Sequence, residues 1–187
     1  MTYQEALHYL YAATPAFHLI GSSAYKPGLA NTEALLAALG NPHEQRHYIH
    51  VAGTNGKGST CHLLASVLQS AGYHVGLYTS PHLVDFGERI RIDGDMIEQD
   101  YVIDFVSHHR DLLDRIHPSF FEITMAMAFC YFADRHVDVA VVEVGLGGRL
   151  DATNIIHPDL CVITNIGLDH TEFLGNSLPQ IAAYVEA

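Results

Sequence analysis

The segment from Gly53 to Thr60 (GTNGKGST) constrains the fold most, because an alternating apolar run at 47–51 leads into it and an apolar helical pattern follows it. A strand, a glycine-rich loop and a helix in that order can cradle a phosphate, since the loop N–H groups and the positive end of the helix converge. Lys57 would add a mobile charge. The common nucleotide-loop pattern is not met, because Val51 replaces its first glycine and Gly58 follows the lysine in place of Ser or Thr. Taken alone, the segment is also compatible with a glycine-rich turn and a solvated lysine.

Helical and strand patterns alternate along the rest of the chain. Apolar spacing predicts helices at 3–11, 31–39 (with Asn31 as a cap), 97–115 and 120–132, and a helix after the loop with an apolar face of Leu63, Leu64, Val67, Leu68 and Ala71. Strands are expected at 47–51, 74–79, 137–144 and 160–166, the last two as β-branched runs typical of buried strands. Residues 89–96 suggest a small hairpin or exposed excursion around Asp93-Gly94. The alternation implies an α/β fold with a mostly parallel sheet flanked by helices.

Composition limits the class of partner. With 187 residues, 49% of them apolar, the chain suits one α/β domain, or one domain with an appendage, and can fill a core. A formal charge of −12 makes a nucleic-acid backbone an unfavourable partner. An anionic ligand would need local positive groups, and basic residues do lie in or beside glycine-rich or turn-like segments, namely Lys57, Arg89, Arg91 and Arg149. Exposed arginines on loops are ordinary, so each arginine also has that simpler interpretation.

The cysteines and the apolar runs indicate the compartment. Cys61, Cys130 and Cys161 are odd in number, far apart and flanked mainly by apolar residues, so we expect buried thiols in a reducing compartment. The N-terminus does not resemble a secretory signal, and the longest apolar run, 123–133, is too short to span a bilayer. We therefore expect a soluble cytoplasmic protein that does not bind membranes.

Four predicted strands each end near a chemically useful residue: Lys57, Ser80, Glu143 and His170. In open α/β sheets, ligands bind outside the carboxyl ends of the strands, so these residues are expected to converge. Glu143 follows an apolar run, where a lone carboxylate is costly and a cation would offset the cost. Because Mg²⁺ prefers oxygen ligands, Glu143, the Ser80 hydroxyl and a nucleotide phosphate form a reasonable ligand set. Ser80 is equally compatible with a turn before Pro81, and a histidine after a strand is more often structural.

Several segments together resemble the folylpolyglutamate synthase/dihydrofolate synthase family, within the Mur ligase superfamily. They are the glycine-rich segment 53–60, TSPHL at 79–83, ERIR at 88–91, EVGLGGRLDATN at 143–154 and GLDHT at 167–171. The first segment alone indicates the superfamily, and the others narrow the resemblance to the folate branch. It runs from about Pro27 to about Gly175. It implies that residues 1–187 are the N-terminal part of a P-loop-containing, Mur ligase central-type ATPase domain, and that the C-terminal glutamate-ligase domain is absent.

The resemblance also implies an activity. The family uses ATP to convert a folate or dihydropteroate carboxylate into an acyl phosphate, which the amino group of L-glutamate then attacks. ATP and Mg²⁺ are therefore the expected cofactors. By the same resemblance, ATP is expected to contact Thr54, Asn55, Gly56, Lys57, Gly58, Ser59 and Thr60. Mg²⁺ is expected at Ser80, Glu143 and His170, and the expected catalytic residues are Lys57 and His170.

Two further segments are expected to bind the folate or pterin ring. By resemblance they are Ser119, Phe120, Phe121 and Glu122, together with Leu150, Asp151 and Ala152. An aromatic and apolar wall with a few polar groups suits a heterocycle. The simpler interpretations are that Phe120 and Phe121 belong to the core and that Asp151 caps the turn that follows it.

Two departures from the family pattern bear on activity. Val185 stands where the family has a lysine that becomes carbamylated and helps to hold a second metal, and valine has no amine to replace it. Asp85-Phe86-Gly87 stands where a basic residue and an asparagine are usual, and an acid there would disfavour an anionic folate tail. This second departure is expected to affect substrate binding more than nucleotide binding.

These observations give a leading hypothesis and two alternatives. We expect the parent protein to be an ATP- and Mg²⁺-dependent carbon–nitrogen ligase acting on small molecules, and this chain alone to be inactive. Self-association is expected through the apolar surface that the missing parts would cover. The alternative is a non-catalytic nucleotide- or pterin-binding module derived from that enzyme, and a general phosphate-loop ATPase ranks last.

Overall fold

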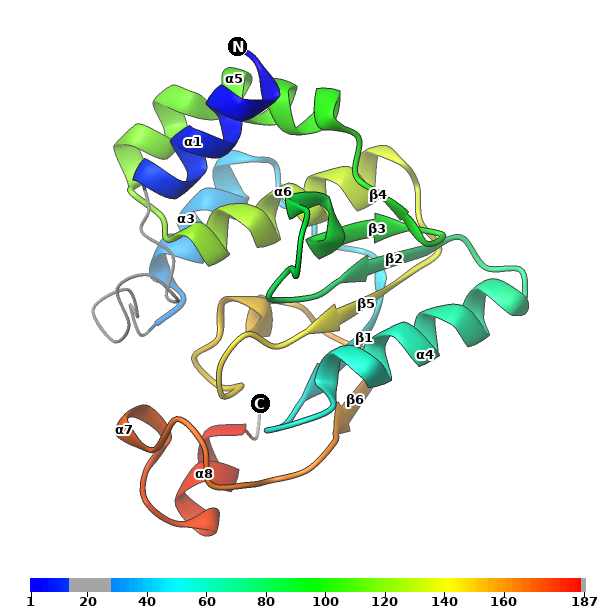
Figure 1. Cartoon of the computed structure of the whole chain (residues 1–187), viewed down its shortest axis with the longest axis vertical. Coiled ribbons are helices and arrows are strands. Elements are labelled where there is room, and N and C mark those ends of the chain that lie inside the picture. Colours follow the sequence, from blue (N-terminus) through cyan, green and yellow to red (C-terminus); the bar gives the residue numbers. More distant parts are fainter. Residues whose placement is uncertain (14–27, 186–187) are drawn as a thin grey trace.

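The computed structural model describes residues 1–13 and 28–185, and the strands of this part of the chain form one sheet (Figure 1). The strand order is β4-β3-β2-β5-β1-β6. Four strands run parallel: β1 His47–Ala52, β2 Val75–Tyr78, β5 Val139–Glu143 and β6 Leu160–Ile163. At one edge, β3 Ile90–Ile92 and β4 Asp95–Met96 form an antiparallel hairpin beside β2. The expected α/β fold with a mostly parallel sheet is confirmed, and so is the hairpin.

Helices cover both faces of the sheet (Figure 1). On one face lies α4, and on the other lies α6, with α1, α3 and α5 packed around it. The helices are α1 Tyr3–Ala13, α3 Ala30–Ala38, α4 Lys57–Ser70, α5 Gln99–Ile116, α6 Phe120–Asp134, α7 Thr171–Leu174 and α8 Leu178–Val185, with short 3-10 helices η2 Phe86–Arg89 and η3 Ala152–Ile155. The five predicted helices are confirmed. The expected cap is wrong, because α3 begins at Ala30 and Asn31 lies inside it.

Alternation along the strands divides the core into two layers. In β5, Val141 packs against α4, whereas Ala140 and Val142 belong to the cluster around α6. This follows from the two-residue period of a strand, which sends neighbouring side chains to opposite faces. Both faces of β5 are therefore apolar, as the β-branched run predicts, and the strand lies at the centre of the sheet.

The buried helix α6 anchors the larger layer. Eleven of its side chains are buried, and the ring of Phe132 lies against β2 at Gly76, where an added Cβ would come within 2.9 Å of the ring. Burying a ring of this size stabilises the fold by about 2–3 kcal/mol. The Ser119 hydroxyl accepts a hydrogen bond from the Glu122 N–H and so starts the helix. No helix among residues 1–13 and 28–185 is long and apolar enough to cross a membrane.

The predicted apolar face of α4 is wrong in part. Cys61 and Ala65 are buried against the sheet, and Leu64 and Leu68 pack partly beside them. Leu63 and Val67, in contrast, are 68% and 66% exposed. The sheet contacts a stripe about one residue out of phase with the apolar pattern, because the strand-to-helix loop sets the rotation of the helix.

The prediction that 160–166 forms a buried strand is also wrong. The strand β6 ends at Ile163 and lies at the sheet edge, where Leu160 and Ile163 are each 50% exposed. An edge strand pairs on one side only, so a β-branched sequence does not by itself secure burial. Cys161 is exposed for the same reason. Cys61 is buried as expected, and Cys130 is partly exposed.

Candidate active site

The glycine-rich loop joins β1 to α4. Gly53 has φ 129° and Gly56 has φ 81°, which are left-handed values that favour glycine. Gly56 occupies the N-cap position of α4, and no side chain caps the helix there. Asn55, Gly56 and Ser59 are exposed. The first N–H groups of the helix and their positive partial charge are thus available to an anion.

A second segment, which follows β6, holds the loop in place. Thr54 N–H donates to the Asn165 carbonyl at 3.0 Å, and Asn55 N–H donates to Asn165 Oδ1 at 2.9 Å. The Gly167 N–H donates to Thr54 Oγ1 at 2.8 Å. Sequence reasoning missed Asn165 because it lies inside the predicted strand 160–166, whereas β6 ends at Ile163; the polar Thr164-Asn165 pair near the end of that apolar run is a usable signal. These contacts fix the backbone of Thr54 and Asn55 before any ligand binds.

Lys57 is the first residue of α4 and folds back over the loop. Its ammonium donates to the carbonyl oxygens of Gly53 at 2.9 Å and Thr54 at 3.3 Å. The positive charge of Lys57 therefore lies over the glycine-rich loop. In phosphate-binding loops of this kind, the phosphate group binds at that position.

Glu143 ends β5 and lies beside the glycine-rich loop. Its Oε2 accepts a hydrogen bond from the Ser80 N–H at 2.8 Å, and the Gly58 N–H also bonds to the carboxylate. The residue is only 4% exposed. Burial raises the pKa of Glu143, while the two N–H donors and the Lys57 charge oppose that rise. The structure thus brings Ser80, Glu143 and the loop together at the carboxyl ends of β2, β5 and β1.

His170 lies at the start of α7, beyond β6. Its backbone adopts φ 47°, its side chain is 45% exposed, and its N–H donates to Asp169 Oδ1 at 2.8 Å. Within the described ranges, no group of three or more His, Cys, Asp or Glu side chains gathers closely enough to hold a metal. His170 therefore follows the carboxyl end of β6, as expected, but within the described residues it is not part of a preformed cluster of such ligands.

The start of α6 has mostly structural contacts. The N–H of Ser119 donates to Glu122 Oε2 at 2.6 Å, and the buried Glu122 also accepts from the Thr32 hydroxyl at 3.1 Å. Phe120 is buried and stacks on Tyr11 with ring centroids 5.2 Å apart. Ser119, Phe120 and Glu122 therefore belong chiefly to the helix cap and the core.

Phe121 and Asp151 meet at Gly145. A Cβ on Gly145 would lie 2.7 Å from the Phe121 ring and 3.1 Å from Asp151 Oδ2. Phe121 is half-buried, with its ring centroid 5.8 Å from that of Tyr78. Leu150 is half-buried and Ala152 is buried on either side of Asp151. The structure thus joins the two segments that the resemblance assigns to the heterocycle.

The Asp151 carboxylate is itself held by a buried hydrogen-bonded chain. It accepts from the Leu146 N–H at 2.9 Å and from the Thr153 N–H and hydroxyl at 3.0 and 2.5 Å, so it caps η3. Thr153 Oγ1 lies 2.8 Å from His50 Nε2. Since the threonine hydroxyl donates to Asp151, the imidazole must donate to the threonine. Burial lowers the pKa of His50 to about 4 and raises that of Asp151.

The segment between Ser80 and Arg89 has its own fixed conformation. The Glu88 carboxylate accepts from the N–H groups of Leu83, Val84 and Asp85 at 2.8–3.0 Å. Asp85 in turn accepts from the Gly87 N–H at 2.7 Å, so this departure from the family pattern has a local structural role. Its expected effect on an anionic folate tail stays a prediction.

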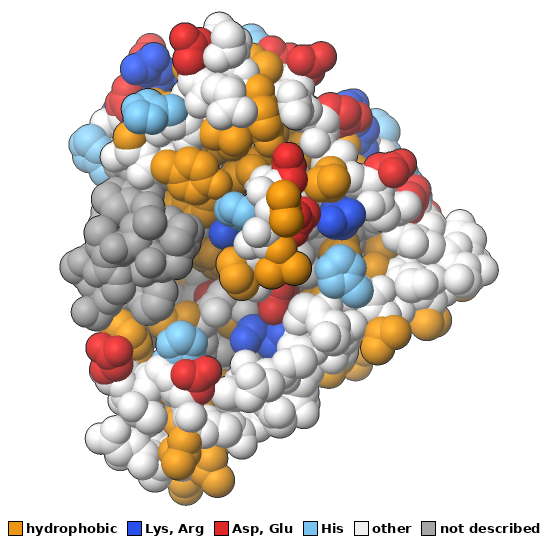
Figure 2. Space-filling model, in the orientation of Figure 1, with side chains coloured by type: hydrophobic (Ala, Val, Ile, Leu, Met, Phe, Trp, Pro, Cys, Tyr) orange, Lys and Arg blue, Asp and Glu red, His pale blue; other side chains and the backbone are white. Residues whose placement is uncertain are grey.

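Arg89 is the main site-facing residue that sequence reasoning did not identify as buried. It is 4% exposed, its Nε donates to His82 Nδ1 at 2.7 Å, and its guanidinium lies 5.0 Å from the centre of the Phe120 ring. Figure 2 shows one face of the molecule, where acidic, basic and histidine side chains surround a hollow.

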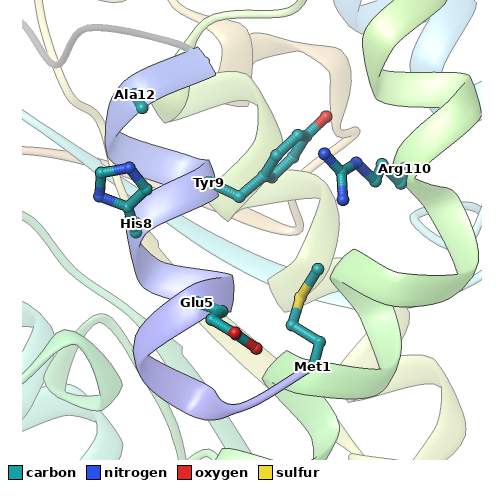
Figure 3. Close-up of a pocket in the computed structure, with 6 residues that line it drawn as sticks. All are labelled: Met1, Glu5, His8, Tyr9, Ala12 and Arg110. Atoms are coloured by element: carbon teal, nitrogen blue, oxygen red, sulfur yellow. The ribbon is translucent and has the colours of Figure 1, made fainter.

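A separate open cavity of about 480 Å³ lies between α1 and α5. It is lined by Met1, Glu5, His8, Tyr9, Ala12 and Arg110 (Figure 3). The Arg110 guanidinium lies over the Tyr9 ring, 5.2 Å from its centroid, and the Tyr9 hydroxyl donates to Asp114 at 2.6 Å. Tyr9 and Arg110 are thus engaged with each other and with Asp114, and the helices that carry them lie away from the carboxyl ends of the strands (Figure 1).

Comparison with known proteins gives the family. The Mur ligase middle domain family matches residues 51–186. The dihydrofolate synthase/folylpolyglutamate synthase of Bacillus subtilis is 46% identical over 164 residues, which cover 84% of this chain and 38% of that protein. The apo form of L. casei FPGS has a TM-score of 0.89 at 40% identity, covering 99% of this chain and 45% of that one. A solved FPGS-AMPPCP-folate complex has a TM-score of 0.87 at 38% identity, covering 100% of this chain and 46% of that one.

The chain thus spans less than half the length of the relatives described above. Their similarity nevertheless extends across the glycine-rich loop, the strand ends and the segment after β6. The chain belongs to the Mur ligase family, in its folylpolyglutamate synthase/dihydrofolate synthase branch.

Proposed function

We propose that this chain supplies the nucleotide-binding part of an ATP-dependent ligase that joins L-glutamate to a folate or dihydropteroate carboxylate through an acyl phosphate. One observation carries the proposal: the buried Glu143 carboxylate accepts hydrogen bonds from Ser80 and Gly58 beside Lys57. The site combines the Glu143 carboxylate, the Lys57 ammonium and the uncapped N–H groups at the start of α4. This combination suits the transfer of a phosphoryl group to an anionic nucleophile. The solved relative that contains AMPPCP and folate supports the same ligand classes.

In this proposal, residues 54–60 bind the phosphates of ATP. The exposed N–H groups around Gly56 and Ser59 take the phosphate oxygens, and the Thr60 side chain adds a hydroxyl in the first turn of the helix. Lys57 exchanges its bonds to the Gly53 and Thr54 carbonyls for the transferring phosphoryl group, whose charge it stabilises.

The donor set fits one Mg²⁺ ion. Glu143 and the Ser80 hydroxyl would hold it together with phosphate oxygens, and His170 would contribute as the third protein ligand, which is consistent with the few protein ligands that Mg²⁺ usually takes. When bound, Mg²⁺ would neutralise charge on the phosphates. A second ion held by residue 185 does not fit, because Val185 has no donor and is buried with Ala52, Val144, Leu174 and Ile181.

The heterocycle would lie where Phe121 and Asp151 meet at Gly145, with Leu150 and Ala152 beside them. Ser119, Phe120 and Glu122 would take part by fixing the start of α6, since their polar atoms and ring already have partners. From this position the substrate carboxylate can point towards Lys57. A carboxylate oxygen then attacks the γ-phosphorus in line, the bond to the bridging oxygen breaks, and ADP leaves. The amine of L-glutamate displaces phosphate in the second step.

The test is an assay of the chain with ATP, Mg²⁺, L-glutamate and dihydropteroate or tetrahydrofolate. Formation of ADP together with a glutamylated product, both abolished by Lys57→Ala, would establish the ligase activity for this chain. Saturable ATP binding that is lost in Lys57→Ala, without product, would show that the chain binds nucleotide but does not catalyse. ATP hydrolysis that ignores folates would instead favour a general ATPase and contradict the proposal.

Self-association through β6 is part of the proposal. Leu160 and Ile163 are half exposed on this edge strand, where a further strand can pair. Sedimentation of the wild type and of Ile163→Lys tests this, because a monomeric wild type at high concentration would contradict it.

A ligase of this kind would work in the cytoplasm, which agrees with the free thiols of the described residues.

A further inference from the structure

Arg89 is a buried cation for which the described residues provide no ion pair. Arg89 is 4% exposed. Within residues 1–13 and 28–185, its side chain donates a hydrogen bond to a neutral acceptor, Nδ1 of His82, at 2.7 Å. Removing a guanidinium from water without a carboxylate partner is costly, so buried arginines usually have one. An anionic ligand would provide that partner.

Within the part of the chain that the structure describes, only Nε of the Arg89 guanidinium has a hydrogen-bond partner, and the two terminal nitrogens remain for such a ligand. Arginine keeps its proton, so Nδ1 of His82 must be the acceptor and its Nε2 carries the hydrogen, 3.4 Å from the Tyr11 hydroxyl. The Phe120 ring supports the plane of the guanidinium from 5.0 Å. With Nε bonded and the plane supported, the terminal nitrogens form a fork that matches the two oxygens of a carboxylate.

Arg89 is near residues of both halves of the proposed site. Its guanidinium lies over the ring of Phe120, whose neighbour Phe121 lies at Gly145 with Asp151. The charge of Glu143 also attracts that of Arg89, although no ion pair joins the two residues. A molecule that placed its ring at Phe121 and its acid group near Lys57 would therefore pass Arg89.

The geometry points to Arg89 as the residue that binds the carboxylate of the pterin-type substrate and so selects the acid over a neutral analogue. This inference rests on the proposed function. Arg89 holds the carboxylate oxygens by charge-assisted hydrogen bonds and orients them towards the phosphate loop, and it does not exchange a proton. A charge-assisted pair of this kind corresponds to about a 10- to 100-fold preference in affinity.

The competing explanation is that Arg89 only braces the segment 80–89 against α6. The test compares dihydropteroate with its carboxamide, which has the same ring system and no charge. Dissociation constants for both are measured in the presence of AMPPCP and Mg²⁺, for the wild type, Arg89→Gln and Arg89→Lys. The matched control is Arg91→Gln, two residues along the chain, since Arg91 NH1 bonds to the Gly94 carbonyl at the hairpin.

We expect the wild type and Arg91→Gln to prefer the acid by at least about 10-fold, and Arg89→Gln to lose this preference while its affinity for the carboxamide and AMPPCP stays within about 2-fold. Arg89→Lys keeps the positive charge but lacks the two terminal nitrogens of the guanidinium, so it should retain only part of the preference for the acid. If Arg89→Gln fails to fold, the lysine variant provides the test of the inference. Equal weakening of both ligands by Arg89→Gln, or an intact preference, would overturn the inference while leaving the proposed function in place. A wild type that binds AMPPCP but neither pterin would overturn both the folate assignment and the role of Arg89.

Discussion

The backbone N–H of Ser80 donates a 2.8 Å hydrogen bond to Oε2 of Glu143, and this bond joins the carboxyl ends of β2 and β5. The two residues lie 63 positions apart in the chain. Their contact depends on the parallel pairing of β2 with β5, in which Tyr78 lies opposite Val142. The Gly58 N–H bonds to the same carboxylate and links the glycine-rich loop to both strands.

Replacing Glu143 by glutamine should separate the role of the charge from that of the fold. Glu143→Gln keeps the shape and one oxygen for the N–H donors, and it removes a buried charge, so we expect stability to change by no more than about 1–2 kcal/mol. Mg²⁺-dependent affinity for AMPPCP should fall by about 10-fold or more, because a neutral amide is a poor ligand for a hard cation. Calorimetric titration with and without Mg²⁺ measures this. Glu98→Gln, which alters an exposed pair with Arg135, should leave the affinity unchanged, and equal losses in both variants would contradict the assignment.

His50 should make the fold sensitive to mild acid. Its pKa falls from 6.5 in the unfolded chain to about 4 in the folded protein because of burial. Above pH 6.5 both states are neutral, and between pH 6.5 and 4 only the unfolded state gains a proton, so stability is lost as the pH falls. The loss attributable to this group is about 3 kcal/mol. His50→Gln keeps a donor for Thr153 and does not titrate, so denaturant unfolding at pH 7 and pH 4.5 should show a smaller loss for the variant. Identical losses in the two proteins would contradict the prediction.

Two glycines of the loop provide a matched pair of substitutions. Gly53 and Gly56 both have positive φ, but a Cβ on Gly53 would lie 2.2 Å from Thr164 Oγ1 and 2.9 Å from the Asn165 carbonyl, whereas a Cβ on Gly56 meets nothing within 4 Å. Gly56→Ala should cost about 1 kcal/mol through backbone strain alone. Gly53→Ala should cost about 1–3 kcal/mol more, because it also pushes the loop away from residues 164–165. Urea unfolding of both variants checks the difference, and similar costs would show that the close approach to Thr164 does not matter.

The sequence predicts the parts of this fold that depend on periodicity and chain order. The alternation of strands and helices fixes the carboxyl edge of the sheet, and this is why Ser80, Glu143 and the glycine-rich loop could be expected to meet. The rotation of α4 could not be predicted in the same way, since Leu63 and Val67 have the right spacing and yet are exposed. An apolar pattern gives the period of a helix but not which neighbour it meets.

Burial of single polar residues was the less predictable part of the site. Asp151 has both the expected position near Phe121 and a structural role as the cap of η3, and only the hydrogen bonds reveal that one carboxylate serves Thr153 and Leu146. Arg89 follows an acidic residue in a turn, a context typical of exposed arginines. Its burial arises because the hairpin β3-β4 joins the sheet edge and brings the residue over Phe120, which is a consequence of tertiary structure.

Glu88 should control the order of the segment that carries His82. Its carboxylate accepts from three consecutive N–H groups, those of Leu83, Val84 and Asp85, and these bonds lower the pKa of Glu88 from 4.5 to about 2. The ionised form therefore holds the segment above pH 4.5, and this hold is lost as the pH falls from 4.5 towards 2. Glu88→Gln should speed hydrogen exchange at the three amides at neutral pH, because a neutral oxygen is a weaker acceptor. Exchange measured by NMR tests this, with the exposed Asp95→Asn on β4 as the control that should leave the three rates unchanged. Unaltered exchange in Glu88→Gln would show that the conformation of the segment does not depend on this charge.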